Sequence, residues 1–195
     1  MTEYFFTQEQ KEAAHRDPVM VDLETLSTAG TAAIISIGAC KFDPSTNQIT
    51  DTFHVVVDKV DSIEHGLHID QETIKWWERQ SPEARAASYD SREGVPLKTA
   101  LRDFAEWCSD SEVWGNGSDF DCSILANAYR VTGIPQPWKF WKTRCYRTVK
   151  NQYPNITLDR HGTHHSAVDD AVTQALHLMK ILKYKRNLDK LVLGE

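Results

Sequence analysis

Three short stretches of the chain carry side chains that could do chemistry. They are "VDLET" (21–25) with two acids, "NGSDFD" (116–121) with two more, and "HGTHHSAVDDA" (161–171) with three histidines and two aspartates. Carboxylates can bind divalent cations or act as acids and bases, and an imidazole changes its charge near neutral pH. Each stretch could therefore form a metal site or an acid–base pair, and each could also be an ordinary polar surface segment.

The first stretch places Asp22 and Glu24 two residues apart in a predicted strand. Because a strand has a period of two, both carboxylates leave the same face of the sheet. Two acids side by side within a sheet are unfavourable unless a cation compensates their charge. The alternative is a strand end that reaches solvent, where acids need no compensation, so this pair alone does not decide between the two.

The second and third stretches lie at predicted helix starts. Asp121 follows a strand-to-glycine turn, and the sites of open α/β sheets gather at the carboxyl ends of strands. Alternatively, Asp119 and Asp121 only serve the positive end of the helix dipole. His165 precedes the predicted final helix and Asp170 lies in its second turn, which places the imidazole beside the carboxylate. No Lys-Ser or Lys-Thr follows the glycines, so a nucleotide-binding P-loop is not supported.

The elements that must position these residues are predicted to make one α/β domain. Apolar runs predict a meander of three antiparallel strands over 19–25, 31–43 and 49–58, and a further strand within 112–117. Caps and helical spacing predict helices over 70–80, 81–89, 96–110, 118–133, 143–152 and 166–186. This order predicts a mixed β-sheet flanked by helices in a single domain, 18–187. Residues 1–17 are predicted to be an appended helix or arm, and residues 188–195 a C-terminal tail.

The composition indicates a folded cytoplasmic protein. No secretory signal is expected from the first residues, no apolar run is long enough to span a bilayer, and the four cysteines are widely separated. The formal charge of −6 argues against a nucleic-acid partner, unless several carboxylates bind cations. Five basic residues within twelve positions are either a solvated helix face or a local basic contact surface: Lys139, Lys142, Arg144, Arg147 and Lys150.

The order of the three acidic stretches resembles that of the DEDDh 3′–5′ exonucleases, a family with an RNase H-like (DnaQ-like) fold. "DLET" (22–25) matches the D-x-E-T motif of the family. "HSAVDDA" (165–171) matches H-x-A-x-x-D-A, which assigns the two roles of that motif to His165 and Asp170. In addition, "TIKWWERQSPEAR" (73–85) is similar to a segment of phage exonucleases of the DexA type and of related small bacterial exoribonucleases.

The middle motif of the family matches less closely. "NGSDFD" has three residues between Asn116 and Phe120, where many proofreading members have two. Asp119 therefore competes with Asp121 for the role of the motif's aspartate.

The resemblance implies a 3′–5′ exonuclease that hydrolyses single-stranded DNA or RNA from its 3′ end and releases nucleoside 5′-monophosphates. Two Mg²⁺ or Mn²⁺ ions would be held by Asp22, Glu24, Asp121 and Asp170, and oxygen ligands suit such hard cations. The resemblance makes His165 the general base, and this fits a group that titrates near the working pH.

The resemblance and the aromatic residues also imply substrate contacts. Thr25, Asn116 and Phe120 belong to the matched motifs, and Leu26 occupies a position that wedges terminal nucleotides in the family. Of the adjacent tryptophans, one is expected to pack in the core and the other to stack on a base, and Trp77 is the predicted substrate contact; the alternative is that both pack internally.

Two other functions compete with this one. A zinc hydrolase could draw nitrogen ligands from five histidines, namely His65, His68, His161, His164 and His165, but it leaves the paired acids of the first strand unexplained. A nucleic-acid-binding module with the same fold could have lost catalysis altogether. A homodimer is possible in either case, and no membrane partner is expected.

Overall fold

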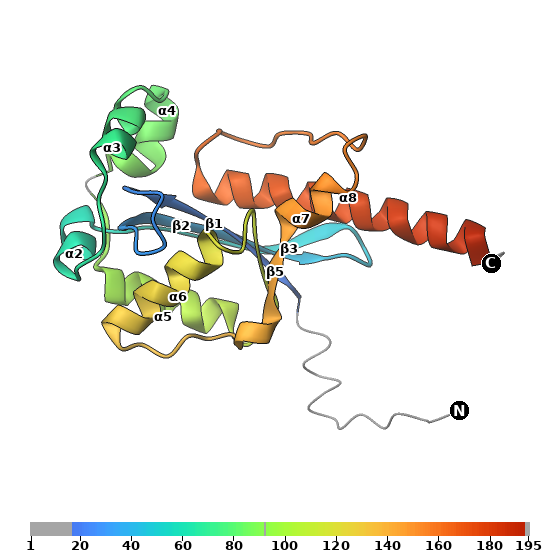
Figure 1. Ribbon diagram of the computed structural model, residues 1–195, viewed down its shortest axis with the longest axis horizontal. Helices are drawn as coiled ribbons and strands as arrows, with labels where there is room; N and C mark the ends of the chain where they lie inside the picture. Colours follow the sequence, from blue (N-terminus) through green and yellow to red (C-terminus); the bar gives the residue numbers. More distant parts are fainter. Residues whose placement is uncertain (1–16, 92, 194–195) are drawn as a thin grey trace.

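The computed structural model describes residues 17–91 and 93–193, in which five strands form one mixed sheet (Figure 1). The order across the sheet is β3-β2-β1-β4-β5, with β1 antiparallel to β2, β2 antiparallel to β3, and β1, β4 and β5 parallel. The strands are β1 (Val19–Thr25), β2 (Ile34–Asp43), β3 (Gln48–Val56), β4 (Val113–Gly115) and β5 (Thr143–Cys145). The predicted mixed sheet with an antiparallel meander is confirmed.

The helices begin and end largely where the caps predict. They are α2 (Lys59–Glu64), α3 (Gln71–Glu78), α4 (Pro82–Ala84), η1 (Arg85–Tyr89), α5 (Leu97–Cys108), α6 (Asp121–Thr132), η2 (Phe140–Lys142), α7 (Tyr146–Asn151) and α8 (Ala167–Leu193). Asp70 caps α3 by accepting from the Glu72 N–H, and the Ser81 hydroxyl accepts from the Ala84 N–H. Gly133 ends α6 with φ of +70°, a conformation that costs glycine little.

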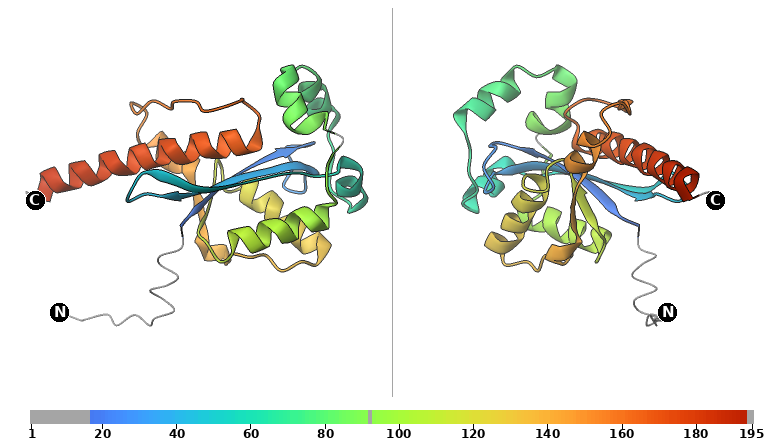
Figure 2. Two further views of the ribbon diagram at one scale, coloured as in Figure 1. Left: turned by 180° about the vertical axis from the view of Figure 1, so that it is seen from behind. Right: turned by 45° about the vertical axis from the view of Figure 1, so that its right-hand side comes forward.

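Helices cover both faces of the sheet, with α7 and α8 on one face and α5 and α6 on the other (Figures 1 and 2). Strand β1 separates two cores, because Val19, Val21 and Leu23 join the larger cluster and Met20 joins the cluster under α8. The even-numbered positions of β1 therefore face α8. None of the described helices is long and apolar enough to cross a membrane.

The structure differs from the prediction at several places, among them η2, which was not predicted, and the predicted 81–89 helix, which is divided into α4 and the π-helix η1. Thr143–Cys145 is a short strand and not the start of a helix, because it pairs with the free edge of β4. Three residues are too few to show the alternation of apolar and polar residues by which a strand is predicted. Helix α2 was not predicted, and it starts at an Asp58 cap within a polar segment. Helix α6 starts at Asp121, after a loop. Helix α8 continues to Leu193, past the boundary expected at 188. Residues 1–16 of the predicted N-terminal arm lie outside the described residues.

Gly38 sets how closely α8 lies on the sheet. A Cβ built at Gly38 would lie 2.1 Å from the Ala167 carbonyl carbon and 2.1 Å from the Val168 nitrogen. Gly38 also pairs with Asp22 across β1 and β2. The absence of a side chain at this position thus brings the first turn of α8 next to Asp22.

We expect Gly38→Ala to lower the free energy of unfolding by about 1–3 kcal/mol, because the backbone of α8 must move away from the sheet. Urea unfolding of the variant measures this loss. Gly30→Ala is the matched control, since a Cβ at Gly30 meets nothing within 4 Å. Equal stability of the two variants would contradict the close approach.

Candidate active site

Carboxylates from β1 and α8 converge above the sheet. Asp22 and Glu24 occupy even-numbered positions of β1, which face α8, and Asp170 lies in the first turn of α8. One oxygen from each of the three can be chosen so that all lie within 4.8 Å of one another. The period-two prediction for the β1 pair agrees with this arrangement, and a segment almost 150 residues away completes the cluster.

Asp121 joins this cluster from the first residue of α6. Its Oδ1 accepts from the Leu23 N–H at 3.2 Å, and its Oδ2 accepts from the Asn116 N–H at 3.0 Å. Both donors flank the strand ends, so the carboxylate is fixed between β1 and β4. Asp119 is exposed to solvent and makes no such contact. The structure therefore brings Asp121, and not its competitor, to the other acids.

The cluster is buried, and this shifts its titration. Burial raises the pKa of Asp22 well above its usual range, and the charges of Asp121 and Asp170 raise it further. Burial also raises the pKa of Glu24, with Asp22 as the next contributor, and raises the pKa of Asp121 to about 7. Ionising Asp22, Glu24 and Asp121 together at neutral pH therefore needs a compensating positive charge.

The donor set fits hard divalent cations. It consists of carboxylate oxygens, and the Oε1 atom of Glu24 is buried without a hydrogen-bond partner among the described residues. A buried carboxylate oxygen without a partner is unfavourable unless a cation or a solvent molecule binds it. Mg²⁺ or Mn²⁺ between these acids would satisfy this oxygen and offset the repulsion.

Two residues that sequence reasoning missed contact the acids. The Gln174 Nε2 donates to Asp22 Oδ1 at 2.7 Å, from one turn beyond Asp170 on α8. The Arg160 guanidinium pairs with Asp170 Oδ1. The i, i+4 spacing of Asp170 and Gln174 on one helix face could have identified the glutamine. Nothing in the sequence marks Arg160, because it lies in an irregular loop.

His165 lies between the carboxylates and an aromatic side chain. Its backbone N–H donates to Asp170 Oδ2 at 3.0 Å, and its ring meets the Trp76 ring edge-to-face with centroids 4.8 Å apart. Burial lowers the pKa of His165, and the neighbouring His164 lowers it further. The imidazole is therefore neutral at pH 7 and able to accept a proton.

The histidines do not gather as a zinc hydrolase would require. Of the five candidates, only His164 and His165 come together, with Asp170 as a third group within 4.8 Å. His68 bonds to Ser27, His65 bonds to the Asp61 carbonyl of its own helix, and His161 is exposed. Asp170 is shared with the acid cluster, so the arrangement favours oxygen ligands.

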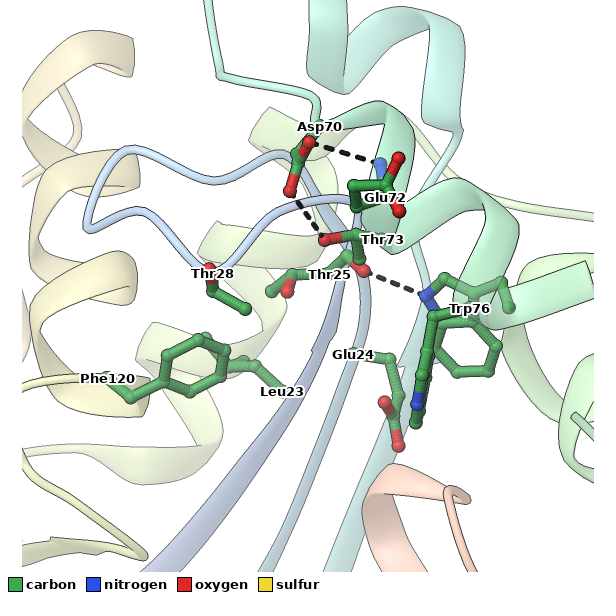
Figure 3. Close-up of a pocket in the computed structure, with 10 residues that line it drawn as sticks. Leu23, Glu24, Thr25, Thr28, Asp70, Glu72, Thr73, Trp76 and Phe120 are labelled. Carbon is green, nitrogen blue, oxygen red and sulfur yellow. Dashed lines mark hydrogen bonds between the residues drawn. The ribbon is translucent and has the colours of Figure 1, made fainter. Parts of the chain in front are cut away.

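A cavity of about 400 Å³ opens beside the acids, and Glu24 lies in its wall (Figure 3). Figure 3 shows Phe120 and Trp76 on opposite sides of this cavity, with hydroxyl and carboxylate groups around its rim. The residues that line it are Leu23, Glu24, Thr25, Thr28, Asp70, Glu72, Thr73, Trp76, Trp77 and Phe120. Flat apolar walls and a polar rim suit a nucleoside.

Two of the expected substrate contacts are buried among core residues. Trp77 is 1% exposed, its indole N–H donates to the Thr25 carbonyl at 2.9 Å, and its ring stacks on Tyr89. It has no free face for a base, whereas the neighbouring Trp76 is half-buried and lines the cavity. Leu26 is 4% exposed and packs in the larger core cluster.

The raised pKa values predict how the metal-free protein responds to pH. A carboxyl with a raised pKa keeps its proton when folded and releases it when unfolded, between its usual pKa and its folded pKa. The unfolding free energy should therefore fall as pH rises from about 4 through about 7, the folded pKa of Asp121. Melting in EDTA at pH 5.5 and pH 8 measures this, and Mn²⁺ should restore stability at pH 8. An equal change in melting temperature between pH 5.5 and pH 8 for the parent and for Asp22→Asn would contradict the prediction.

Known proteins share this fold and sequence pattern. The model of the 3′–5′ exoribonuclease Rv2179c-like domain matches residues 17–182. The protein named exodeoxyribonuclease of Enterobacteria phage T4 is 27% identical over 208 residues, covering 87% of this chain and 91% of its own. This relative bears out the similarity to a phage exonuclease.

Solved structures share the fold at low sequence identity. The nuclease domain of 3′hExo, a DEDDh family member bound to rAMP, superimposes with a TM-score of 0.60 at 14% identity, covering 88% of this chain and 94% of that one. Pop2p of S. pombe, in its Mg²⁺- and Mn²⁺-bound form, gives a TM-score of 0.60 at 13% identity, covering 88% and 84%. Taken with the family match, these likenesses show that the chain belongs to the 3′–5′ exoribonuclease Rv2179c-like domain family and is a 3′–5′ exonuclease with the RNase H-like fold.

Proposed function

We propose that the enzyme removes nucleotides from the 3′ ends of single-stranded DNA or RNA and releases nucleoside 5′-monophosphates. The observation that carries this proposal is the convergence of the Asp22, Glu24 and Asp170 carboxylates beside a cavity with aromatic walls. The cavity is closed by Trp77 and the core behind it, so it suits a strand terminus more than a continuous strand. The terminal nucleoside would lie between Phe120 and Trp76.

The four acids would hold two Mg²⁺ or Mn²⁺ ions, with Asp22, Glu24 and Asp170 offering oxygens that lie within 4.8 Å of one another and Asp121 close enough for its charge to act on Asp22. When bound, such ions supply a water molecule of lowered pKa and compensate the charge of the leaving oxygen. The choice of these ions is supported by Pop2p of S. pombe, which shares the fold and was solved in a Mg²⁺- and Mn²⁺-bound form.

The remaining residues position groups and move a proton. An imidazole nitrogen of His165 accepts the proton of the attacking water, and burial favours the neutral ring that this needs. Gln174 holds Asp22 through its Nε2, and the backbone N–H groups of Leu23 and Asn116 fix Asp121. Fixed carboxylates need no reorganisation during the reaction.

The sugar preference is tested together with the activity. 5′-labelled single strands of DNA and RNA are incubated with Mn²⁺ or Mg²⁺, beside an EDTA control. We expect ladders that shorten from the 3′ end only with metal, and 5′-monophosphates as the released product. Relative rates rank the two sugars. Binding of either strand with no cleavage under any metal would instead indicate a module that has lost catalysis.

A further inference from the structure

Charge is strongly segregated along this acidic chain. From Cys122 through Leu158 there is no acidic residue, although the chain has 28 of them, and the same segment holds six of its 22 lysines and arginines. The segment includes η2, β5 and α7, which follow one another at the edge of the sheet. An acidic protein that gathers cations at one edge presents an anion-binding surface there.

The same edge exposes two large aromatic rings. Phe140 is 81% exposed and Trp141 is 60% exposed, and their centroids lie 4.9 Å apart in an edge-to-face pair. The neighbouring rings of Trp138 and Tyr146 are buried. Aromatic side chains of this segment can therefore pack in the core, whereas Phe140 and Trp141 stay exposed. Adjacent exposed aromatics flanked by cations are typical of platforms on which bases of a single strand stack.

This surface is continuous with the active site. Strand β5 leads from η2 to α7, where the Arg147 guanidinium donates to the Asn116 carbonyl and Lys150 Nζ lies 3.5 Å from Asn116 Oδ1. A second cavity of about 280 Å³, which shares Leu23 and Glu24 with the first, is lined by Asp22 and Asp170 and also by Asn116 and Lys150. A single-stranded nucleic acid that extends away from the acids can therefore meet α7 first and the aromatic pair Phe140–Trp141 afterwards.

Part of the positive charge along this path is compensated. Lys142 pairs with Asp110, and Arg144 pairs with Glu112. Among the residues that the structure describes, Lys139, Arg147 and Lys150 have no ion pair. We call these three cations together with Phe140 and Trp141 the basic edge.

The strand register gives the length of the path. Thr143 aligns with Val113, and Val113 aligns with Val19. Asp22 lies three residues after Val19, and Trp141 lies two residues before Thr143. The two side chains are therefore about five residues apart along the strand direction and two strands apart across the sheet. These separations amount to about 20 Å. At the stacked spacing of about 3.4 Å per nucleotide, the distance corresponds to about six nucleotides.

We propose that the basic edge binds the part of the single strand that lies 5′ of the cleaved end, with phosphates along α7 and bases stacked on Phe140 and Trp141. This inference rests on the proposed function and adds a second contact region to it. Stacking and phosphate contacts carry no base preference, so the effect should depend on strand length and salt and not on sequence.

The test compares a strand that can reach the aromatic pair with one that cannot. The Phe140→Ala/Trp141→Ala double variant is assayed on a 20-nucleotide and a 3-nucleotide substrate with Mn²⁺. We expect KM for the long strand to rise about tenfold, as loss of base stacking predicts, with kcat unchanged. KM for the short strand should stay the same. Tyr184→Ala, which removes a 48% exposed ring from α8, is the matched control.

Direct binding separates this proposal from the proposed function. Anisotropy of the labelled 20-mer in EDTA should show about tenfold weaker binding for the double variant, even if the parent enzyme cleaved neither substrate. Equal effects on both lengths, or no effect on either, would overturn the proposal. A change from dimer to monomer in the double variant, with strand binding unchanged, would assign the surface to a second copy and also overturn it.

Discussion

Replacing Asp22 by asparagine should lower the rate of nucleotide release on the order of 10³-fold, as loss of a fixed charge in an active site does. One carboxylate oxygen of Asp22 lies within 4.8 Å of oxygens from both Glu24 and Asp170, and the charges of Asp121 and Asp170 both raise the pKa of Asp22. Asparagine keeps the shape and can still meet Gln174, but it removes one negative charge from the cation site. Assays with saturating Mn²⁺ measure the loss of rate. Calorimetry measures the loss of Mn²⁺ affinity.

The same substitution should stabilise the metal-free protein at pH 8. The Asp22 carboxylate is buried next to other acids, so its ionisation at that pH opposes folding. A higher melting temperature in EDTA, combined with lost activity, would show that the variant folds and lacks only the metal site. Asp119→Asn is the matched control, because Asp119 is exposed two residues before Asp121, and it should keep its activity within about twofold. Equal losses in both variants would contradict the assignment of the acids.

Much of the site could be predicted because its parts follow local rules. The period of a strand places Asp22 and Glu24 on one face whatever surrounds them, and the structure has both facing α8. The caps at Asp70 and Ser81 depend on neighbouring backbone N–H groups, and both form as expected. Predictions of this kind succeed since they need only a few consecutive residues.

The remainder depends on contacts between distant segments. Which of two adjacent tryptophans is buried follows from the Thr25 carbonyl and the Tyr89 ring that meet Trp77, and neither partner is visible from the pair itself. The choice of Asp121 over Asp119 likewise requires the Leu23 N–H, 98 positions away. Strand β5 forms only because β4 offers a free edge. Tertiary contacts override local patterns at each of these places.

Replacing His165 by asparagine should slow hydrolysis about 10²–10⁴-fold and leave Mn²⁺ binding intact, as expected for loss of a general base. His165 has φ of +63°, and asparagine tolerates this conformation better than most residues, so the backbone should keep its path. The pH dependence gives a second readout. Because burial and His164 lower the pKa of His165, the parent's rate should rise with pH below the ordinary value of 6.5, and this limb should disappear in the variant.

His164 provides the matched control for this experiment. Its ring stacks on that of His165 at 3.8 Å between centroids, but His164 is exposed, and it is the His165 ring that meets Trp76. His164→Asn should therefore cost much less than the neighbouring substitution and keep the acidic limb of the pH profile. A large loss at His164 with a small one at His165 would reverse the assignment of the base. Loss of Mn²⁺ binding in either variant would mean that the imidazole is a ligand, because a general base does not contribute to metal affinity.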